Sequence, residues 1–158
     1  MKHIKEYNEY VDPFHEDDWD EVEPIEPDGK FLTWLKIKYP DENKWKDIKD
    51  IYCGKQNLTD LIGIDKLINL EILDCYNNQL TELDLSKNIK LEYLYCSNNQ
   101  LTKLNINKNI KLIGLYCQNN QLRKLDVTKN INLINLFYRH NQLTKLDTSK
   151  NIKLELLI

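Results

Sequence analysis

Four cysteines recur at nearly constant spacing, and their thiols are the side chains best suited to metal or redox chemistry. Cys53, Cys75, Cys96 and Cys117 are separated by 22, 21 and 21 residues. Zinc sites in proteins use pairs of ligands a few residues apart, and this spacing provides no such pairs. We therefore expect a ladder of buried thiols that fills the core as small apolar groups, with no metal and no cofactor.

The three histidines give no sign of a catalytic site. His3 and His15 lie near the N-terminus, and His140 lies far along the chain. None has a Cys, a Ser or a carboxylate that the sequence pattern places beside it as a catalytic partner. The sequence also lacks a glycine-rich phosphate loop and a His-Glu-x-x-His motif. It therefore predicts a protein that is not an enzyme.

Aromatic residues form a second regular column, and their chemistry suits binding. The candidate binding residues are Tyr52, Asp74, Tyr76, Tyr93, Tyr95, Tyr116, Gln118, Phe137, Arg139 and His140. Tyrosine and arginine are favoured at binding hot spots, and exposed aromatic surface usually contacts a partner. Alternatively, tyrosines stacked across strands only stabilise a sheet. We expect Tyr95→Ala together with Tyr116→Ala to abolish partner binding and to leave melting nearly unchanged, whereas lost folding would show that the column is structural.

A 21-residue repeat must position these columns. Asn-Gln-Leu recurs at residues 78, 99, 120 and 141, and Lys-Asn-Ile recurs at residues 87, 108, 129 and 150. The alternation in Leu73-x-Cys75 is that of a strand, so both side chains face the same side. One coil cannot bury that face alone, whereas stacked coils share a continuous core. We therefore predict a repeat solenoid in which a ladder of asparagines serves a structural role: Asn78, Asn99, Asn120 and Asn141.

The spacing Leu70-x-x-Leu73-x-Cys75-x-x-Asn78-x-Leu80 resembles that of leucine-rich repeats. Residues 48–158 are most similar to the internalin-like class of bacterial or viral short repeats, in its cysteine-containing variant. This resemblance implies an α/β repeat solenoid: a right-handed coil with a concave parallel β-sheet, a convex side without α-helix and a small N-terminal helical cap. It also implies a module that binds a protein partner, without identifying that partner.

The chain divides into three parts. Residues 1–29 form an acidic leader that we expect to be flexible, unless Trp19 packs on the cap or serves as a recognition motif. Residues 30–47 form the cap, in which Phe31, Trp34 and Leu35 have helical spacing and Pro40 ends the helix. Residues 48–158 form about five coils and a terminal strand. Asp41 and its neighbours lack the pattern of a calcium loop.

Charge and hydropathy limit the possible partners and locations. Residues 1–30 carry a net charge of −8 and residues 31–158 a net charge of +5, too weak to predict nucleic-acid binding. No apolar stretch is long enough to span a membrane, and the N-terminus lacks the features of a signal peptide. The sequence thus predicts a cytoplasmic protein, or one in the host cytoplasm if it is viral.

Two alternatives to protein binding remain open. Leu154, Leu157 and Ile158 end the solenoid without a polar cap, so two copies could join there as a homodimer or a larger self-assembled structure. Aromatic faces could instead stack on sugars, which would make the chain a glycan-binding module. The lysines of the Lys-Asn-Ile motif are interpreted as a solvated convex face.

Overall fold

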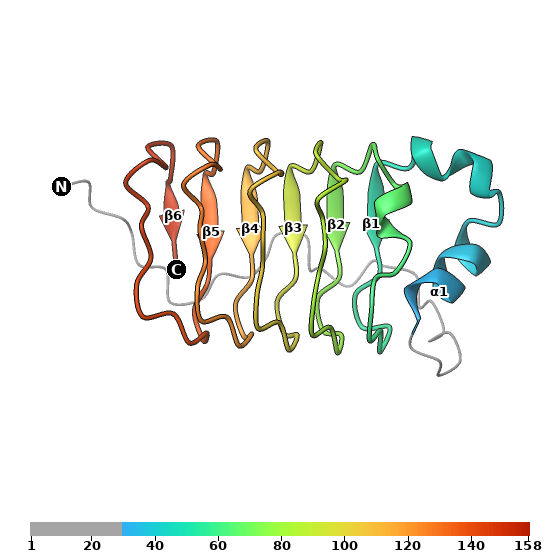
Figure 1. Ribbon diagram of the computed structural model, residues 1–158, viewed down its shortest axis with the longest axis horizontal. Helices are drawn as coiled ribbons and strands as arrows, with labels where there is room; N and C mark the ends of the chain where they lie inside the picture. The colour runs from blue at the N-terminus through green and yellow to red at the C-terminus, as the bar shows by residue number, and fades with distance from the viewer. Residues whose placement is uncertain (1–29) are drawn as a thin grey trace.

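Six short parallel strands form one face of a stack of coils. The computed structural model describes residues 30–158. The strands pair in chain order, each with its sequence neighbour (Figure 1). They are β1 (Asp50–Tyr52), β2 (Ile72–Asp74), β3 (Tyr93–Tyr95), β4 (Gly114–Tyr116), β5 (Asn135–Phe137) and β6 (Leu156–Leu157). The architecture confirms the repeat solenoid with a parallel sheet that the sequence predicted.

The core lies between the sheet and the return path of each coil. In register, Leu73 pairs with Leu94 and Leu94 with Leu115, so the central residue of each strand faces inward above the next. The cysteines follow on the same side and are fully buried. Residues from the return path, such as Leu80 and Leu85, close the core from behind. Each coil therefore buries its apolar side against its two neighbours, which makes the stack mutually stabilising.

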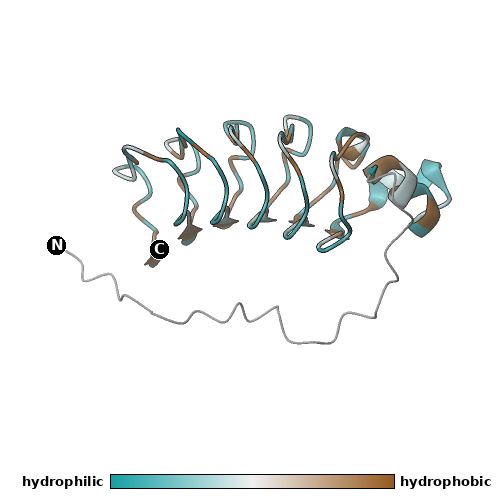
Figure 2. Ribbon diagram, turned by 90° about the horizontal axis from the view of Figure 1, so that it is seen from below, coloured by the Kyte–Doolittle hydropathy of each residue, from teal (hydrophilic) through white to brown (hydrophobic). Residues whose placement is uncertain are grey.

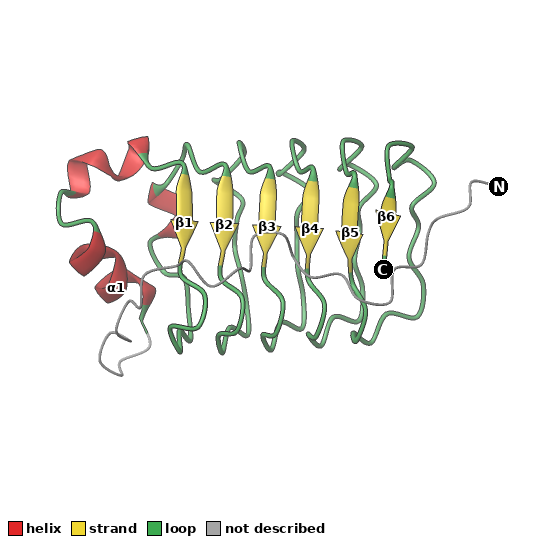
Figure 3. Cartoon of the chain, turned by 180° about the vertical axis from the view of Figure 1, so that it is seen from behind, coloured by secondary structure: helices red, strands yellow, loops and turns green. Residues whose placement is uncertain are grey.

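The return path contains little regular structure. Within residues 48–158 its one helical segment is the 3₁₀ turn η2 (Ile64–Lys66), and the later coils have turns at this place (Figure 3). A coil of 21 residues has too few residues for an α-helix in addition to a strand and two turns. The convex side without α-helix, which the resemblance implied, follows from this short repeat.

A ladder of asparagine amides ties neighbouring coils together where the chain leaves each strand. The side-chain oxygen of Asn99 accepts the backbone N–H of Leu80 at 3.0 Å. Its Nδ2 donates to the carbonyls of Cys75 and Cys96 at 3.0 and 3.2 Å. Asn78, Asn120 and Asn141 make equivalent bonds in their own coils. The amides thus satisfy backbone groups that the turn would otherwise leave unpaired.

A second asparagine ladder lies at the opposite turn. Asn109 is fully buried, and its Nδ2 donates to the carbonyls of Leu85 and Asn88 at 3.0 and 2.9 Å. Asn88, Asn130 and Asn151 repeat the pattern. The Lys-Asn-Ile motif was visible in the sequence, but only its lysines were interpreted, as a solvated face. This ladder could have been predicted, because a polar residue that recurs every 21 residues indicates a structural role in each coil.

A helical cap covers the β1 end of the core. It consists of α1 (Phe31–Lys38) and the 3₁₀ helix η1 (Glu42–Asp47), drawn in red in Figure 3. Phe31, Trp34, Leu35 and Trp45 are buried in the main core cluster. The indole N–H of Trp45 donates to the carbonyl of Tyr39 at 2.7 Å, which fixes the bend between the two helices. The cap therefore protects the first coil, which would otherwise expose its apolar side.

Candidate functional site

The outer face of the sheet carries an apolar cluster separate from the core. Seen along the strands, the sheet lies on one side of the stack and the return path on the other (Figure 2). Tyr95, Tyr116 and Phe137 form this cluster, and Ile72, Tyr93, Leu156 and Ile158 pack against it. We call this outer side of the sheet the concave face. The backbone of the sheet separates its rings from the buried leucines.

The three rings stack in a row. The centroids of Tyr95 and Tyr116 lie 4.5 Å apart, and those of Tyr116 and Phe137 lie 4.9 Å apart. The planes differ by 18° and 14° respectively. In-register parallel pairing places equivalent side chains directly opposite, at roughly the 4.8 Å strand spacing, which is also a stacking distance. The register of the repeat thus converts a sequence column into a stacked row.

The row is more buried than the sequence predicted. Tyr95, Tyr116 and Phe137 are 6%, 4% and 5% exposed. The alternation of the strand places these rings away from the core, and it had therefore predicted that they are exposed. Alternation does not show that stacked rings cover one another's faces. The concave face therefore has an apolar floor rather than a set of projecting aromatic side chains.

The other candidate residues surround this floor. Tyr93 lies 6.5 Å from Tyr95 by ring centroids and is half-buried. Tyr52, Asp74, Tyr76 and Gln118 are also half-buried, whereas Arg139 and His140 are exposed. Lys55 lies over the ring of Tyr76 at 5.4 Å. All ten predicted residues therefore lie in the strands of the sheet or within three residues of a strand's C-terminal end, and Arg139 and His140 are exposed.

Charge is distributed unevenly along the concave face. Asp50 and Asp74 lie in β1 and β2, near Lys55, and Lys49 before β1 pairs with Glu71 at 2.9 Å. Burial raises the pKa of the Tyr52 phenol above its usual value, and the carboxylates of Asp50 and Asp74 raise it further. Arg139 follows β5 at the other end of the sheet. A partner lying along the row would thus meet acidic groups first and a guanidinium later.

The buried environment makes the four cysteine thiols unreactive. All four cysteines are buried and free of disulfides. Burial raises the pKa of the Cys117 thiol to about 12, and it raises the pKa of the other three thiols in the same direction. Metal binding and nucleophilic attack both require the thiolate, which this environment disfavours. Among residues 30–158, no group of three or more His, Cys, Asp or Glu side chains could hold a metal ion.

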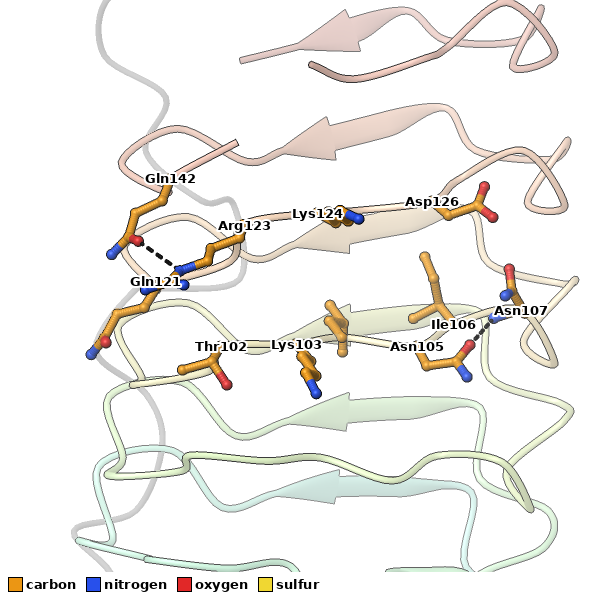
Figure 4. A pocket seen from close by; sticks show the side chains of 11 residues that line it. Thr102, Lys103, Asn105, Ile106, Asn107, Gln121, Arg123, Lys124, Asp126 and Gln142 are labelled. Atoms are coloured by element: carbon orange, nitrogen blue, oxygen red, sulfur yellow. Dashed lines mark hydrogen bonds between the residues drawn. The ribbon is translucent and has the colours of Figure 1, made fainter. Parts of the chain in front are cut away.

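A hollow on the return path was not predicted from the sequence. It has a volume of about 730 Å³ and lies between neighbouring coils (Figure 4). Lys103, Arg123 and Lys124 line it with exposed side chains, above a floor that includes Leu104 and Ile106. Arg123 donates to Gln142 at 3.4 Å. Its charged side chains all reach solvent, although the Oδ1 atom of Asn107, which also lines it, is buried without a hydrogen-bond partner. A specific ligand site needs several convergent polar groups.

Within residues 30–158, no helix has the length and apolar character needed to cross a membrane.

Comparison with known proteins identifies related repeats. Residues 68–109 match the family of Leucine Rich repeats (2 copies). The functional domain of InlJ from Listeria monocytogenes, which includes a cysteine ladder, is 41% identical over 72% of this chain, with a TM-score of 0.70. Internalins InlF and InlC2 of the same organism are each 25% identical, over 74% and 75% of this chain, with TM-scores of 0.68 and 0.67.

These structures are longer than the present chain. It covers 25% of the InlJ structure, 36% of InlF and 54% of InlC2. No curated protein sequence matches the chain. The similarity is therefore to a repeat domain, and it includes the cysteine ladder that the spacing of Cys53, Cys75, Cys96 and Cys117 predicted.

Proposed function

Because the chain belongs to the internalin-like class of leucine-rich-repeat proteins, we propose that it is a non-enzymatic module that binds a protein partner on its concave face. Leucine-rich repeats typically serve as protein–protein interaction modules, since stacked coils provide an extended and rigid surface. The identity of the class supports binding in general. The choice of the concave face depends on the side chains that line it.

One observation carries this choice: the sheet face has its own apolar cluster. Tyr95, Tyr116 and Phe137 contribute nothing to the main core, which lies on the other side of the sheet. A face that served only as a solvated exterior would not need aromatic side chains in consecutive coils. The stacked row also fixes the ring orientations, so little side-chain entropy is lost when a partner docks.

The contacts would come from the floor and its polar border together. Tyr93 and Tyr76 offer partly accessible rings beside the row, and Gln118 offers an amide. Arg139 and His140 are exposed at the β5 end, where their side chains could donate hydrogen bonds to a partner. A border of this kind around an apolar centre resembles the organisation of protein interfaces. It favours a partner with apolar side chains at its centre and a carboxylate near Arg139.

Matched variants test this proposal. The full chain, an Arg139→Glu variant and a Lys103→Glu variant serve as baits, and any partner captured is then purified and titrated by calorimetry. Arg139 lies on the concave face and Lys103 on the return path, and both are exposed. We expect Arg139→Glu to weaken binding at least tenfold and Lys103→Glu to leave it unchanged. The opposite ranking would reject the concave face, and equal affinities would also contradict it.

Self-association is the second candidate, and β6 supports it. Among the described strands, β6 pairs on one side with β5 and has no strand on its other side. Leu154 and Leu157 pack against the core, while Ile158 packs against the aromatic cluster, and all three are half-buried. Light scattering of the full chain should then give a dimer that Leu157→Lys converts to monomer. A monomer at all concentrations would dismiss this candidate.

Glycan binding has weaker support. Sugars stack on open aromatic faces, but both faces of Tyr116 are occupied by Tyr95 and Phe137. A glycan array without binding would remove the sugar hypothesis.

The cytoplasmic location that the sequence predicted also remains a proposal, and the four free thiols fit a reducing compartment. Cell fractionation of the source organism tests this location.

A further inference from the structure

A column of exposed isoleucines runs along one edge of the solenoid. Its members recur every 21 residues in the turn that precedes each strand. They are 50%, 54%, 55%, 53% and 80% exposed, in the order Ile68, Ile89, Ile110, Ile131 and Ile152. Single exposed apolar residues are common on protein surfaces, but five in register form a continuous stripe. Such a stripe usually marks a contact surface.

Lysines border the stripe on both sides. One column precedes the isoleucines by two residues, and a second follows them by one. All are exposed: Lys66, Lys87, Lys108, Lys129 and Lys150 in the first column, and Lys90, Lys111 and Lys153 in the second. We call the isoleucines and these lysines together the Ile–Lys edge. Lysines alone would keep this edge soluble, so the isoleucines call for a partner that is both acidic and apolar.

The acidic groups of this edge are partly engaged. Asp84 accepts the backbone N–H of Ser86 at 2.9 Å, and Asp126 accepts that of Thr128 at 2.9 Å. Asp147 accepts from Ser149 in the same way, and Asp65 is also exposed. Glu71, Glu92 and Glu155 also lie close to this edge in the sequence, two residues after Asn69, Lys90 and Lys153. With eight lysines against four aspartates and three glutamates, the edge keeps a small positive charge. It therefore attracts acidic groups, although less strongly than the lysines alone would.

The chain itself contains a segment with the complementary character. Residues 1–30 hold eleven acidic and three basic side chains, a net charge of −8. Phe14, Trp19, Val22 and Ile25 are interspersed among the acidic residues. A segment that only solvates the protein would not need these apolar side chains. The leader thus has both the acidic and the apolar side chains that a partner of the Ile–Lys edge needs.

The cap connects the leader to the first coil of this edge. Lys66, the first lysine of the edge, lies over the ring of Trp45 in the cap at 5.1 Å. Asn69, beside Ile68, donates to the carbonyl of Lys46 at 2.7 Å. These contacts come from η1, the second helix of the cap. The leader joins the cap at Lys30, where α1 begins, and α1 begins near the opposite ends of the strands from the turns that carry the edge (Figure 1). A leader bound to the edge would therefore have to pass along one coil before it reached Ile68.

The leader is also long enough. Sixteen residues separate Phe14 from Lys30, which allows a reach of roughly 50 Å when extended. Five coils at roughly 4.8 Å each make an edge about 20 Å long. Because both parts belong to one chain, the effective concentration of the leader at the edge is on the order of millimolar. Even a weak interaction would then be populated.

We propose that the acidic leader of this chain binds the Ile–Lys edge of the same molecule. Its carboxylates pair with the lysine columns, and its apolar side chains cover the isoleucines. This interaction is independent of any partner on the concave face. It assigns the Lys-Asn-Ile motif a role in recognition, in addition to the structural role of its asparagine.

Paramagnetic relaxation in the full chain tests the proposal. A His15→Cys variant places a reactive thiol between Phe14 and Trp19, and a nitroxide label attaches there selectively because the native thiols are buried. We expect the backbone amide signals of Ile89, Ile110 and Ile131 to lose at least half of their intensity relative to the reduced label. The signals should recover in about 1 M salt, where the Debye length falls to about 3 Å.

Matched variants separate the edge from the rest of the surface. In the labelled chain, Ile89→Ser, Ile110→Ser and Ile131→Ser together should restore the signals of Lys108 and Lys129. These side chains are more than half exposed, so the fold should tolerate the change. Ile62→Ser is the control, because Ile62 is 66% exposed but lies outside the column. It should leave the broadening unchanged.

Three results would overturn the proposal. Broadening confined to Asn119 and Arg139 would place the leader on the concave face. The absence of broadening from residues 30–158 would mean that the leader binds neither surface. Broadening of isotope-labelled chains by a separate spin-labelled chain would place the leader on a second copy. None of these results would follow from a failure of partner binding at the concave face, so the two proposals are tested separately.

Discussion

The ring of Tyr93 lies directly over Gly114, the residue opposite it on the next strand. A Cβ atom added at Gly114 would lie 2.8 Å from Cδ1 of Tyr93 and 3.0 Å from Cε2 of Tyr116. Tyr93 pairs with Gly114 in the sheet register, so the aromatic side chain fills the space that glycine leaves. Tyr76 covers Gly54 in a similar way. Aromatic side chains thus compensate for glycines that would otherwise weaken their strands.

Gly114→Ala should therefore destabilise the protein, although alanine normally suits a strand better than glycine. The new methyl group would displace the rings of Tyr93 and Tyr116, at a cost of about 1–2 kcal/mol in the free energy of unfolding. Urea denaturation measures this change. A Tyr93→Ala background provides the control, since removal of the ring should reduce the cost of Gly114→Ala. Strict additivity of the two changes would contradict the proposed overlap.

Tyr116→Ala should cost more, because Tyr116 is 4% exposed and lies between two rings. Loss of a buried aromatic side chain typically lowers the free energy of unfolding by about 3 kcal/mol or more. Tyr116→Phe keeps the stacked ring and should cost under about 1 kcal/mol. Thermal melting followed by circular dichroism compares the two variants. Equal melting temperatures for wild type and Tyr116→Ala would show instead that the row does not stabilise the fold, as the sequence had predicted.

Asn99→Ala should destabilise the stack by about 1–3 kcal/mol. The change leaves the buried N–H of Leu80 without its acceptor. It also removes one of two amide donors to each of the carbonyls of Cys75 and Cys96, which keep their bonds from Asn78 and Asn120. Gln100→Ala is the control, because Gln100 is exposed and its backbone N–H, which bonds to Leu80, is retained. Hydrogen exchange should show the loss first at Leu80. Similar stability of the two variants would count against a structural role for Asn99.

The repeat made most of the fold accessible from the sequence. Each interior position occurs in several coils, so an apolar residue at Leu73, Leu94, Leu115 and Leu136 identifies an inward column that a single strand of three residues could not. The same redundancy located the cysteine column and the turn asparagines. The cap was less certain from the sequence, yet Phe31, Trp34 and Leu35 have the spacing of a helix face and are buried.

The burial of the aromatic row could not be read from alternation. The strand period gives the side of the sheet on which Tyr95, Tyr116 and Phe137 lie, but it does not give their exposure, which depends on ring orientation and on what packs against the rings. The covering of Gly114 by Tyr93 has the same origin. The buried position of Asn109 was missed because a polar residue beside lysine suggests a solvated turn. These details arise from contacts between coils rather than within one.

The cysteine ladder predicts a loss of stability at alkaline pH. Burial raises the pKa of Cys117 from an ordinary value of 9.0 to about 12 in the folded protein. Between these values the unfolded chain loses the thiol proton while the folded chain keeps it. Unfolding then releases a proton, so the free energy of unfolding falls as pH rises, by up to about 1.4 kcal/mol per pH unit for this thiol. Well below pH 9.0 this contribution is constant.

Urea midpoints of wild type and Cys117→Ala, measured from neutral pH to about pH 10.5, check this behaviour. The variant should be less stable at neutral pH, because it leaves a small cavity, but its stability should fall less steeply above pH 9.0. Tyrosines and lysines titrate in the same range and are common to both proteins, so the difference between the two curves isolates the thiol. Parallel curves would show that Cys117 ionises equally in the folded and unfolded chains, which its complete burial should prevent.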